Sequence, residues 1–154
     1  MIVASWPRVD GVLARGARRA SGIDRDTPYA GRGTLEWQFP LFKERGLDLS
    51  GCFIGTLNII ISPRTWRLLP GALMLCDVLW YENRKEDFAF SQCHLLFAET
   101  IYPAWVYVVS PGKPHHIRGP HLLEIIAQHI PGITYGATVT LEINPEEIEV
   151  SRPS

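Results

Sequence analysis

The apolar residues of this chain fall into short runs separated by turn residues, which is the pattern of a β-rich protein. Turn signals punctuate the runs at Pro63, Pro70-Gly71 and Pro111-Gly112. In the run at 138–143, apolar and polar residues alternate strictly, as in a strand with one buried face. Together the runs predict strands at residues 9–14, 35–39, 52–62, 72–81, 88–98, 102–109 and 138–143.

Two segments show helical signals instead. Residues 40–45 begin with a proline and are followed by Gly46, which predicts one to two helical turns. Residues 121–130 carry apolar side chains at helical spacing and precede Pro131-Gly132, so a longer helix is expected there. Many strands and little helix favour a mainly β fold, a compact antiparallel barrel with one short and one longer helix, over a doubly wound sheet.

The remaining segments are predicted to be irregular. Residues 15–33 are rich in Gly, Arg, Ser, Asp and Pro, which indicates a long basic loop. Its arginines indicate either a loop that binds a small phosphorylated ligand or a basic loop that is simply solvated, and charge alone does not decide between the two. Residues 145–154 are predicted to form a loose acidic tail, and residues 1–154 to form a single domain.

The composition narrows the classes of function. With 154 residues, 46% of them hydrophobic and 20% charged, the chain is long enough for one core. The formal net charge of -1 argues against a nucleic-acid binder, which neutralises phosphates with clustered Lys and Arg. The longest apolar run, at 101–109, is about half of a bilayer crossing, and the N-terminus has no signal-peptide pattern, so a soluble protein that does not enter membranes is expected. Three cysteines without Cys-x-x-Cys spacing predict buried thiols and a cytoplasmic location.

The most informative motif is Gly55-Thr56-Leu57-Asn58, which sets two oxygen-bearing side chains into an apolar strand. Because side chains alternate along a strand, Thr56 and Asn58 are expected on one face, with their apolar neighbours facing the core. Mg²⁺ keeps several waters and takes phosphate oxygens as ligands, so one hydroxyl and one amide carbonyl can suffice as the protein's share. The motif indicates either a metal-phosphate site or a strand whose outward face is merely polar.

The order of these segments, from about Gly11 to Ile143, resembles the archaeal CTP-dependent riboflavin kinases. These are six-stranded barrels of the cradle-loop type that phosphorylate riboflavin to FMN. The most specific piece is Gly55-Thr56-Leu57-Asn58-Ile59, which is similar to the family's Gly-Thr-Leu-Asn strand. Residues 122–127 and 135–139 are similar to two further family segments, the Glu-Ile-Ile-Glu-Ile-Ile-Ala helix and the turn into the final strand.

The resemblance implies roles for individual residues. Thr56 and Asn58 would be Mg²⁺ ligands. Glu124 would contact the flavin and accept the proton of the attacking hydroxyl, or else be an ordinary exposed helix carboxylate. Trp105 and Tyr107 would pack on the isoalloxazine ring, or else belong to the core.

The nucleotide segment departs from the family pattern. The family has a Gly-x-Gly-x-Gly loop after the first strand, and the stretch here, residues 16–20, keeps one glycine. The family's basic Lys-Leu-Arg segment is also missing at residues 128–132. Arginine side chains and a second glycine pair are expected to substitute for the lost amide contacts. The predicted nucleotide-binding residues are therefore Gly16, Ala17, Arg18, Arg19, Gly31, Arg32 and Gly33.

These observations predict a riboflavin-kinase-like phosphotransferase that transfers a γ-phosphate from CTP or ATP to riboflavin with Mg²⁺. Its partners would be small molecules, the flavin and the nucleotide, and the sequence indicates no oligomeric state. The alternative is a small-molecule-binding or structural barrel that has lost nucleotide binding.

Overall fold

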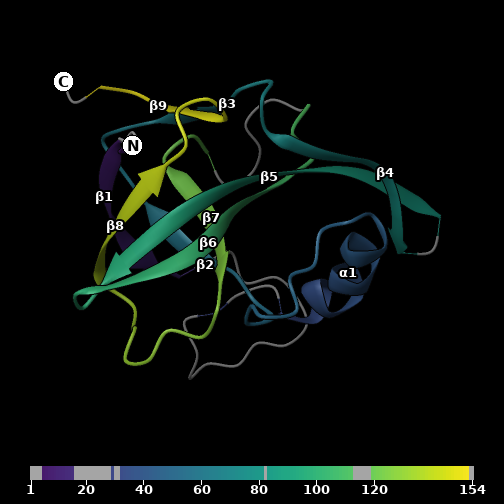
Figure 1. Cartoon of the computed structure of the whole chain (residues 1–154), viewed down its shortest axis with the longest axis horizontal. Helices are drawn as coiled ribbons and strands as arrows, with labels where there is room; N and C mark the ends of the chain where they lie inside the picture. The colour runs from purple at the N-terminus through teal and green to yellow at the C-terminus, as the bar shows by residue number, and fades with distance from the viewer. Residues whose placement is uncertain (1–4, 16–28, 30–31, 82, 113–118, 153–154) are drawn as a thin grey trace, which may run out of the picture.

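The structure is a computed structural model, and it describes residues 5–15, 29, 32–81, 83–112 and 119–152. Six strands form a closed antiparallel barrel in the order β5-β6-β7-β2-β1-β8, and β8 pairs back onto β5 (Figure 1). The predicted mainly β fold with a six-stranded barrel is therefore confirmed. The barrel strands are β1 (Arg8–Ala14), β2 (Leu57–Ile60), β5 (Arg84–Phe97), β6 (Thr100–Val109), β7 (Leu122–Ala127) and β8 (Thr138–Ile143).

An arm extends from one side of the barrel. Strand β4 (Leu73–Tyr81) lies outside the ring and pairs with the first half of β5, whose second half pairs with β8. Helix α1 (Arg32–Glu44) lies beside this arm in Figure 1. A separate two-stranded ribbon joins β3 (Trp66–Leu68) to β9 (Ile148–Val150).

Two apolar cores result from this arrangement. The barrel core fills the interior with residues such as Leu57, Ile59 and Leu123. The helix-side core packs α1 against the outer surface of β4, β5, β6 and β7, and includes Phe42 and Phe88. The β6 and β7 strands therefore carry buried side chains on both of their faces.

The predictions for residues 35–39 and 40–45 are wrong in part, because α1 covers both segments as a single helix. Its buried residues Leu35, Gln38 and Phe42 recur at helical spacing and face the helix-side core. The predicted stop is confirmed: Gly46 has a φ of 99°, and the N–H of Leu47 donates to the carbonyl of Phe42 in a Schellman turn.

The longer helix predicted at 121–130 is wrong, because residues 122–127 are strand β7, so α1 is the only helix in the described part of the chain. β7 pairs with β2 on one side and with β6 on the other. Leu123 and Ile125 enter the barrel core while Ile126 joins the helix-side core. Burial on both faces hides the two-residue period that marks a strand.

Three predicted boundaries change as well. The strand expected at 52–62 is shorter, since β2 covers only Leu57–Ile60. The tail expected at 145–154 is wrong in part, because residues 148–150 form β9 and pair with β3. The loop expected at 15–33 is wrong at its end, because Arg32 and Gly33 already belong to α1.

In the described part of the chain, no helix combines the length and the apolar character needed to cross a membrane.

Candidate functional site

The Thr56 and Asn58 side chains lie on the outer face of the barrel wall. Leu57 and Ile59 point into the barrel core, and alternation along the strand directs Thr56 and Asn58 to the opposite side. Despite this outward direction, Thr56 is only 2% exposed and Asn58 is 0% exposed. The expected division of the strand into one apolar and one polar face is confirmed, and the polar face is buried.

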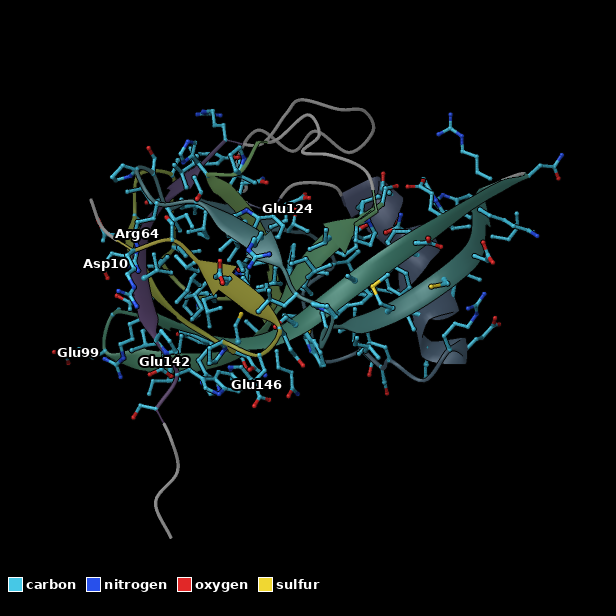
Figure 2. All side chains as sticks on the ribbon, turned by 90° about the horizontal axis from the view of Figure 1, so that it is seen from above. Asp10, Arg64, Glu99, Glu124, Glu142 and Glu146 are labelled. Carbon is cyan, nitrogen blue, oxygen red and sulfur yellow. The ribbon has the colours of Figure 1, made fainter. Side chains whose placement is uncertain are left out.

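Strand register determines the neighbours of Asn58. On one side, Asn58 is opposite Ala14 of β1, and on the other it is opposite Glu124 of β7. Directly opposed residues of an antiparallel pair share a face, with Cβ atoms about 5 Å apart. Glu124 is half-buried, and Figure 2 labels it apart from the acidic residues Asp10, Glu99 and Glu142. The structure therefore brings together Thr56, Asn58 and Glu124.

The Asn58 carboxamide is the chemically unusual group of this face. Neither its Oδ1 nor its Nδ2 has a hydrogen-bond partner among the described residues. A buried polar group without a partner costs about 1–3 kcal/mol, so a group of this kind in a folded protein calls for an explanation such as a bound ion, water or ligand. Oδ1 is a hard oxygen donor, and Nδ2 is a neutral hydrogen-bond donor.

The donor set around Asn58 suits Mg²⁺ better than a transition metal. No group of three or more His, Cys, Asp or Glu side chains within the described ranges could hold a metal ion. The side-chain oxygens on this face belong to a hydroxyl, a carboxamide and a carboxylate, from Thr56, Asn58 and Glu124. Oxygen donors of this kind fit a hydrated Mg²⁺ that takes its other ligands from phosphate.

Most of the predicted nucleotide-binding residues fall outside the described part of the chain: Gly16, Ala17, Arg18, Arg19 and Gly31. Arg32 and Gly33 are described as the first two residues of α1, so they form a helix start rather than the predicted turn.

Trp105 is half-buried on β6, on the same outer face as Asn58 but with strand β7 between them. Its cross-strand partner on β7 is Ile126, which is fully buried in the helix-side core. Trp105 lines a cavity of about 290 Å³ that contains neither Thr56, Asn58 nor Glu124. The contact of Trp105 with a flavin ring stays a prediction. Tyr107, two residues further on, belongs to the helix-side core and donates a hydrogen bond to Gln38.

A second polar cluster was not foreseen from the sequence. His94 Nδ1 lies 3.0 Å from Glu142 Oε1, and Arg8 Nε donates to Glu142 Oε2 at 2.9 Å. These residues come from β5, β8 and β1, which are distant in sequence and meet only because the barrel closes. No local sequence motif connects these residues, so the cluster could have been predicted only from the order of the strands in the barrel.

Comparison with known proteins does not assign the chain to a family: no family model matches it, and no curated protein matches it.

Proposed function

We propose that this chain is a riboflavin-kinase-like phosphotransferase, which transfers the γ-phosphate of a nucleoside triphosphate, CTP or ATP, to riboflavin with the help of Mg²⁺. The observation that carries the proposal is the Asn58 carboxamide, which is fully buried and unpaired among the described residues. The closed barrel and the position of Thr56 on the same face give further support.

In this proposal Thr56 and Asn58 hold the Mg²⁺ ion through their oxygen atoms. The ion, when bound, neutralises the charge that develops on the transferred phosphoryl group. The buried position of both side chains strengthens each electrostatic contact that they make. The Asn58 Nδ2 group has a separate task, which is to donate a hydrogen bond to a substrate oxygen and so fix its orientation.

Glu124 is the proposed catalytic carboxylate. It is opposite Asn58 in the β2–β7 register, so its carboxylate and the carboxamide project from the same face. A carboxylate in this position can accept a hydrogen bond from the hydroxyl of the acceptor and take up its proton as the phosphate is transferred. Glu124 therefore acts on the acceptor, while Thr56 and Asn58 act on the metal and the phosphate.

The nucleotide side of the proposal rests on the arginines and glycines of residues 16–19 and 31–33. Arginine forks bind phosphate oxygens in pairs, which suits a triphosphate. Trp105 is left out of this proposal, because the cavity that it lines contains none of the three proposed catalytic and metal-binding residues. The three cysteines are free thiols, in keeping with an enzyme of the reducing cytoplasm. The prediction that all three are buried is wrong, because Cys52 is half-buried and Cys76 is exposed.

The proposal is tested by incubating the purified protein with riboflavin, Mg²⁺ and either CTP or ATP, and measuring FMN by chromatography. We expect FMN with at least one nucleotide, and none when a chelator removes Mg²⁺. Asn58→Ala should abolish FMN formation. The matched control is Asn144→Ala, which removes another carboxamide, one that accepts the backbone N–H of Glu146 in a turn, and should keep activity.

Failure to form FMN with either nucleotide would contradict the proposal. Binding of riboflavin without turnover would favour a barrel that binds small molecules and has lost its chemistry.

A further inference from the structure

A cavity of about 290 Å³ lies on the outer wall of the barrel, and strand β7 separates it from Asn58 on the same wall. Its volume approaches the lower end of the range for small-molecule sites in proteins. Strands β5 and β6 supply its floor, and the segments before β1, before β2 and after β7 supply its rim. The side chains that give it its chemical character are Trp6, Cys52, Gln92, His94, Trp105 and Gln128.

The floor is a regular patch of two cross-strand pairs. Gln92 is opposite Trp105, and His94 is opposite Pro103. Gln92 and His94 are two residues apart on β5, so both pairs project from the same outer face. Cys93, which lies between them, points into the barrel core. A carboxamide, an indole, an imidazole and a proline ring therefore stand side by side on rigid strands.

One wall of the cavity is held in place by a chain of contacts. The Trp6 and His94 rings are stacked, with centroids 5.4 Å apart and planes inclined by 19°. His94 Nδ1 is directed at Glu142, which Arg8 holds through an ion pair of 2.9 Å. A carboxylate at Nδ1 fixes the proton on that nitrogen, so in the neutral ring Nε2 is a hydrogen-bond acceptor.

Trp105 is held on the other side of the floor. Its ring meets that of Phe90 edge to face, with centroids 6.4 Å apart and planes at 88°. This contact ties the indole to the helix-side core, and Trp105 is half-buried. Two indoles whose positions are set by ring contacts thus line one cavity, together with the carboxamides of Gln92 and Gln128.

The described residues that line the cavity include no Asp, Glu, Lys or Arg. Burial raises the pKa of the Cys52 thiol, and it raises the pKa of Cys93 to about 12, so both thiols are uncharged near neutral pH. A lining without lysine or arginine gives little compensation for a desolvated phosphate or carboxylate. It does suit a flat, uncharged ring, whose faces stack on indole and whose edge atoms bond to carboxamides and imidazole.

We propose that this cavity is a binding site for a neutral, planar nitrogen heterocycle, distinct from the group of Thr56, Asn58 and Glu124 on the same outer wall. The separation follows from the strand order. Ile126 of β7 lies between Trp105 and the Thr56 side of β2, and its side chain is fully buried in the helix-side core. The site therefore does not depend on whether the chain is a kinase.

The test uses three uncharged probes, adenine, uracil and lumichrome, titrated into the full chain and followed by ligand-observed NMR and equilibrium dialysis. We expect saturable one-to-one binding of at least one probe, with a Kd at or below about 1 mM. Trp6→Ala and Gln92→Ala should each weaken it about tenfold. Trp37→Ala is the matched control, because this indole is 64% exposed on α1 and does not line the cavity, and its Kd should stay within about twofold of the wild-type value.

Asn58→Ala separates this inference from the proposed function. It should abolish FMN formation and leave probe binding unchanged. The inference is overturned if no probe saturates, if both Trp6→Ala and Gln92→Ala bind like the wild type, or if Asn58→Ala abolishes binding.

Discussion

Two buried carboxamides of this protein are in opposite situations. Gln38 of α1 is 1% exposed and accepts a hydrogen bond from the hydroxyl of Tyr107, inside the helix-side core. Asn58 of β2 is 0% exposed, and neither of its polar atoms has a partner among the described residues. The two groups are the same functional group at the same depth, so their difference lies in what surrounds them.

The two amides differ in what they contribute to the stability of the fold. A buried amide with a partner contributes a net of about 1 kcal/mol to stability, while one without a partner loses its hydration and gains nothing. The unpaired Asn58 amide therefore weakens the fold unless a ligand, ion or water completes it. We infer that the Gln38 amide serves the fold and that the Asn58 amide serves the ligand.

The largest expected effect is on catalysis. Asn58→Leu keeps the approximate volume of the side chain and removes its polar atoms. The rate of FMN formation should fall by about 100-fold or more, the loss typical when one preorganised polar group is removed from an active site. Steady-state kinetics with riboflavin, nucleotide and Mg²⁺ measure it.

The same variant should not be less stable than the wild type. Its free energy of unfolding, measured with urea in the absence of ligands, should be unchanged or higher by about 1 kcal/mol. A loss of stability in Asn58→Leu would show that the amide is paired in the fold, and the comparison with Gln38 would fail.

The next effect is on stability and concerns Gln38. Gln38→Leu leaves the Tyr107 hydroxyl buried without its acceptor, which should lower the free energy of unfolding by about 1–3 kcal/mol. FMN formation should stay near the wild-type rate at a temperature where the variant is folded. A variant that is as stable as the wild type but inactive would reverse the roles of the two amides.

A smaller effect is expected when both partners of this hydrogen bond are removed. The double variant Gln38→Leu, Tyr107→Phe removes both groups of this hydrogen bond, so its stability should return to within about 1 kcal/mol of the wild type. Urea unfolding of the wild type, both single variants and the double variant measures the coupling. Additive losses would mean that Tyr107 and Gln38 do not act as a pair.

The smallest expected effect is on stability, and it concerns a solvent-exposed ion pair. Arg67 and Glu149 form a two-pronged ion pair between β3 and β9, and both side chains are more than half exposed. The hydrogen bond from Arg67 lowers the pKa of the Glu149 carboxyl below its ordinary value of 4.5. The pair therefore stabilises the fold above that value, and the contribution is lost as the pH falls through the lowered pKa.

Glu149→Gln should accordingly lower the Tm slightly at pH 7, and the difference from the wild type should vanish in acid. Calorimetry at pH 7 and below pH 4 measures both. A difference that grows in acid would have the wrong sign for this assignment.

The strands of the barrel were largely predictable from the sequence. β8 alternates apolar and polar residues because one face fills the barrel and the other is turned outward, and such alternation is visible in the sequence. The segments of β4, β5 and β6 were also expected, because turn residues bracket them.

The secondary structure of two segments was predicted wrongly, because tertiary packing determines it. β7 is covered on both faces, so its apolar residues do not alternate, and their spacing also fits a helix. In α1 the Pro40 ring suggested a boundary, yet Pro40 sits inside the helix on its exposed side. The strand β9 could not be foreseen, because the strand it pairs with in the described part of the chain, β3, lies about 80 residues earlier.

The candidate site was predictable only in part. Alternation along the strand placed Thr56 and Asn58 on one face, and the structure has them there. The burial of that face and the absence of a described partner for Asn58 follow from the packing of distant segments. Glu124 joins the face through the β2–β7 register, which no local pattern contains.

The most direct test observes the two amides themselves. NMR of the side-chain NH₂ resonances, assigned with Asn58→Leu and Gln38→Leu, is recorded as Mg²⁺ and a non-hydrolysable CTP or ATP analogue are added. We expect the Asn58 resonances to shift and saturate with the ligand, while those of Gln38 stay in place. Asn58 resonances that do not respond to saturating Mg²⁺ and either nucleotide analogue would contradict this expectation.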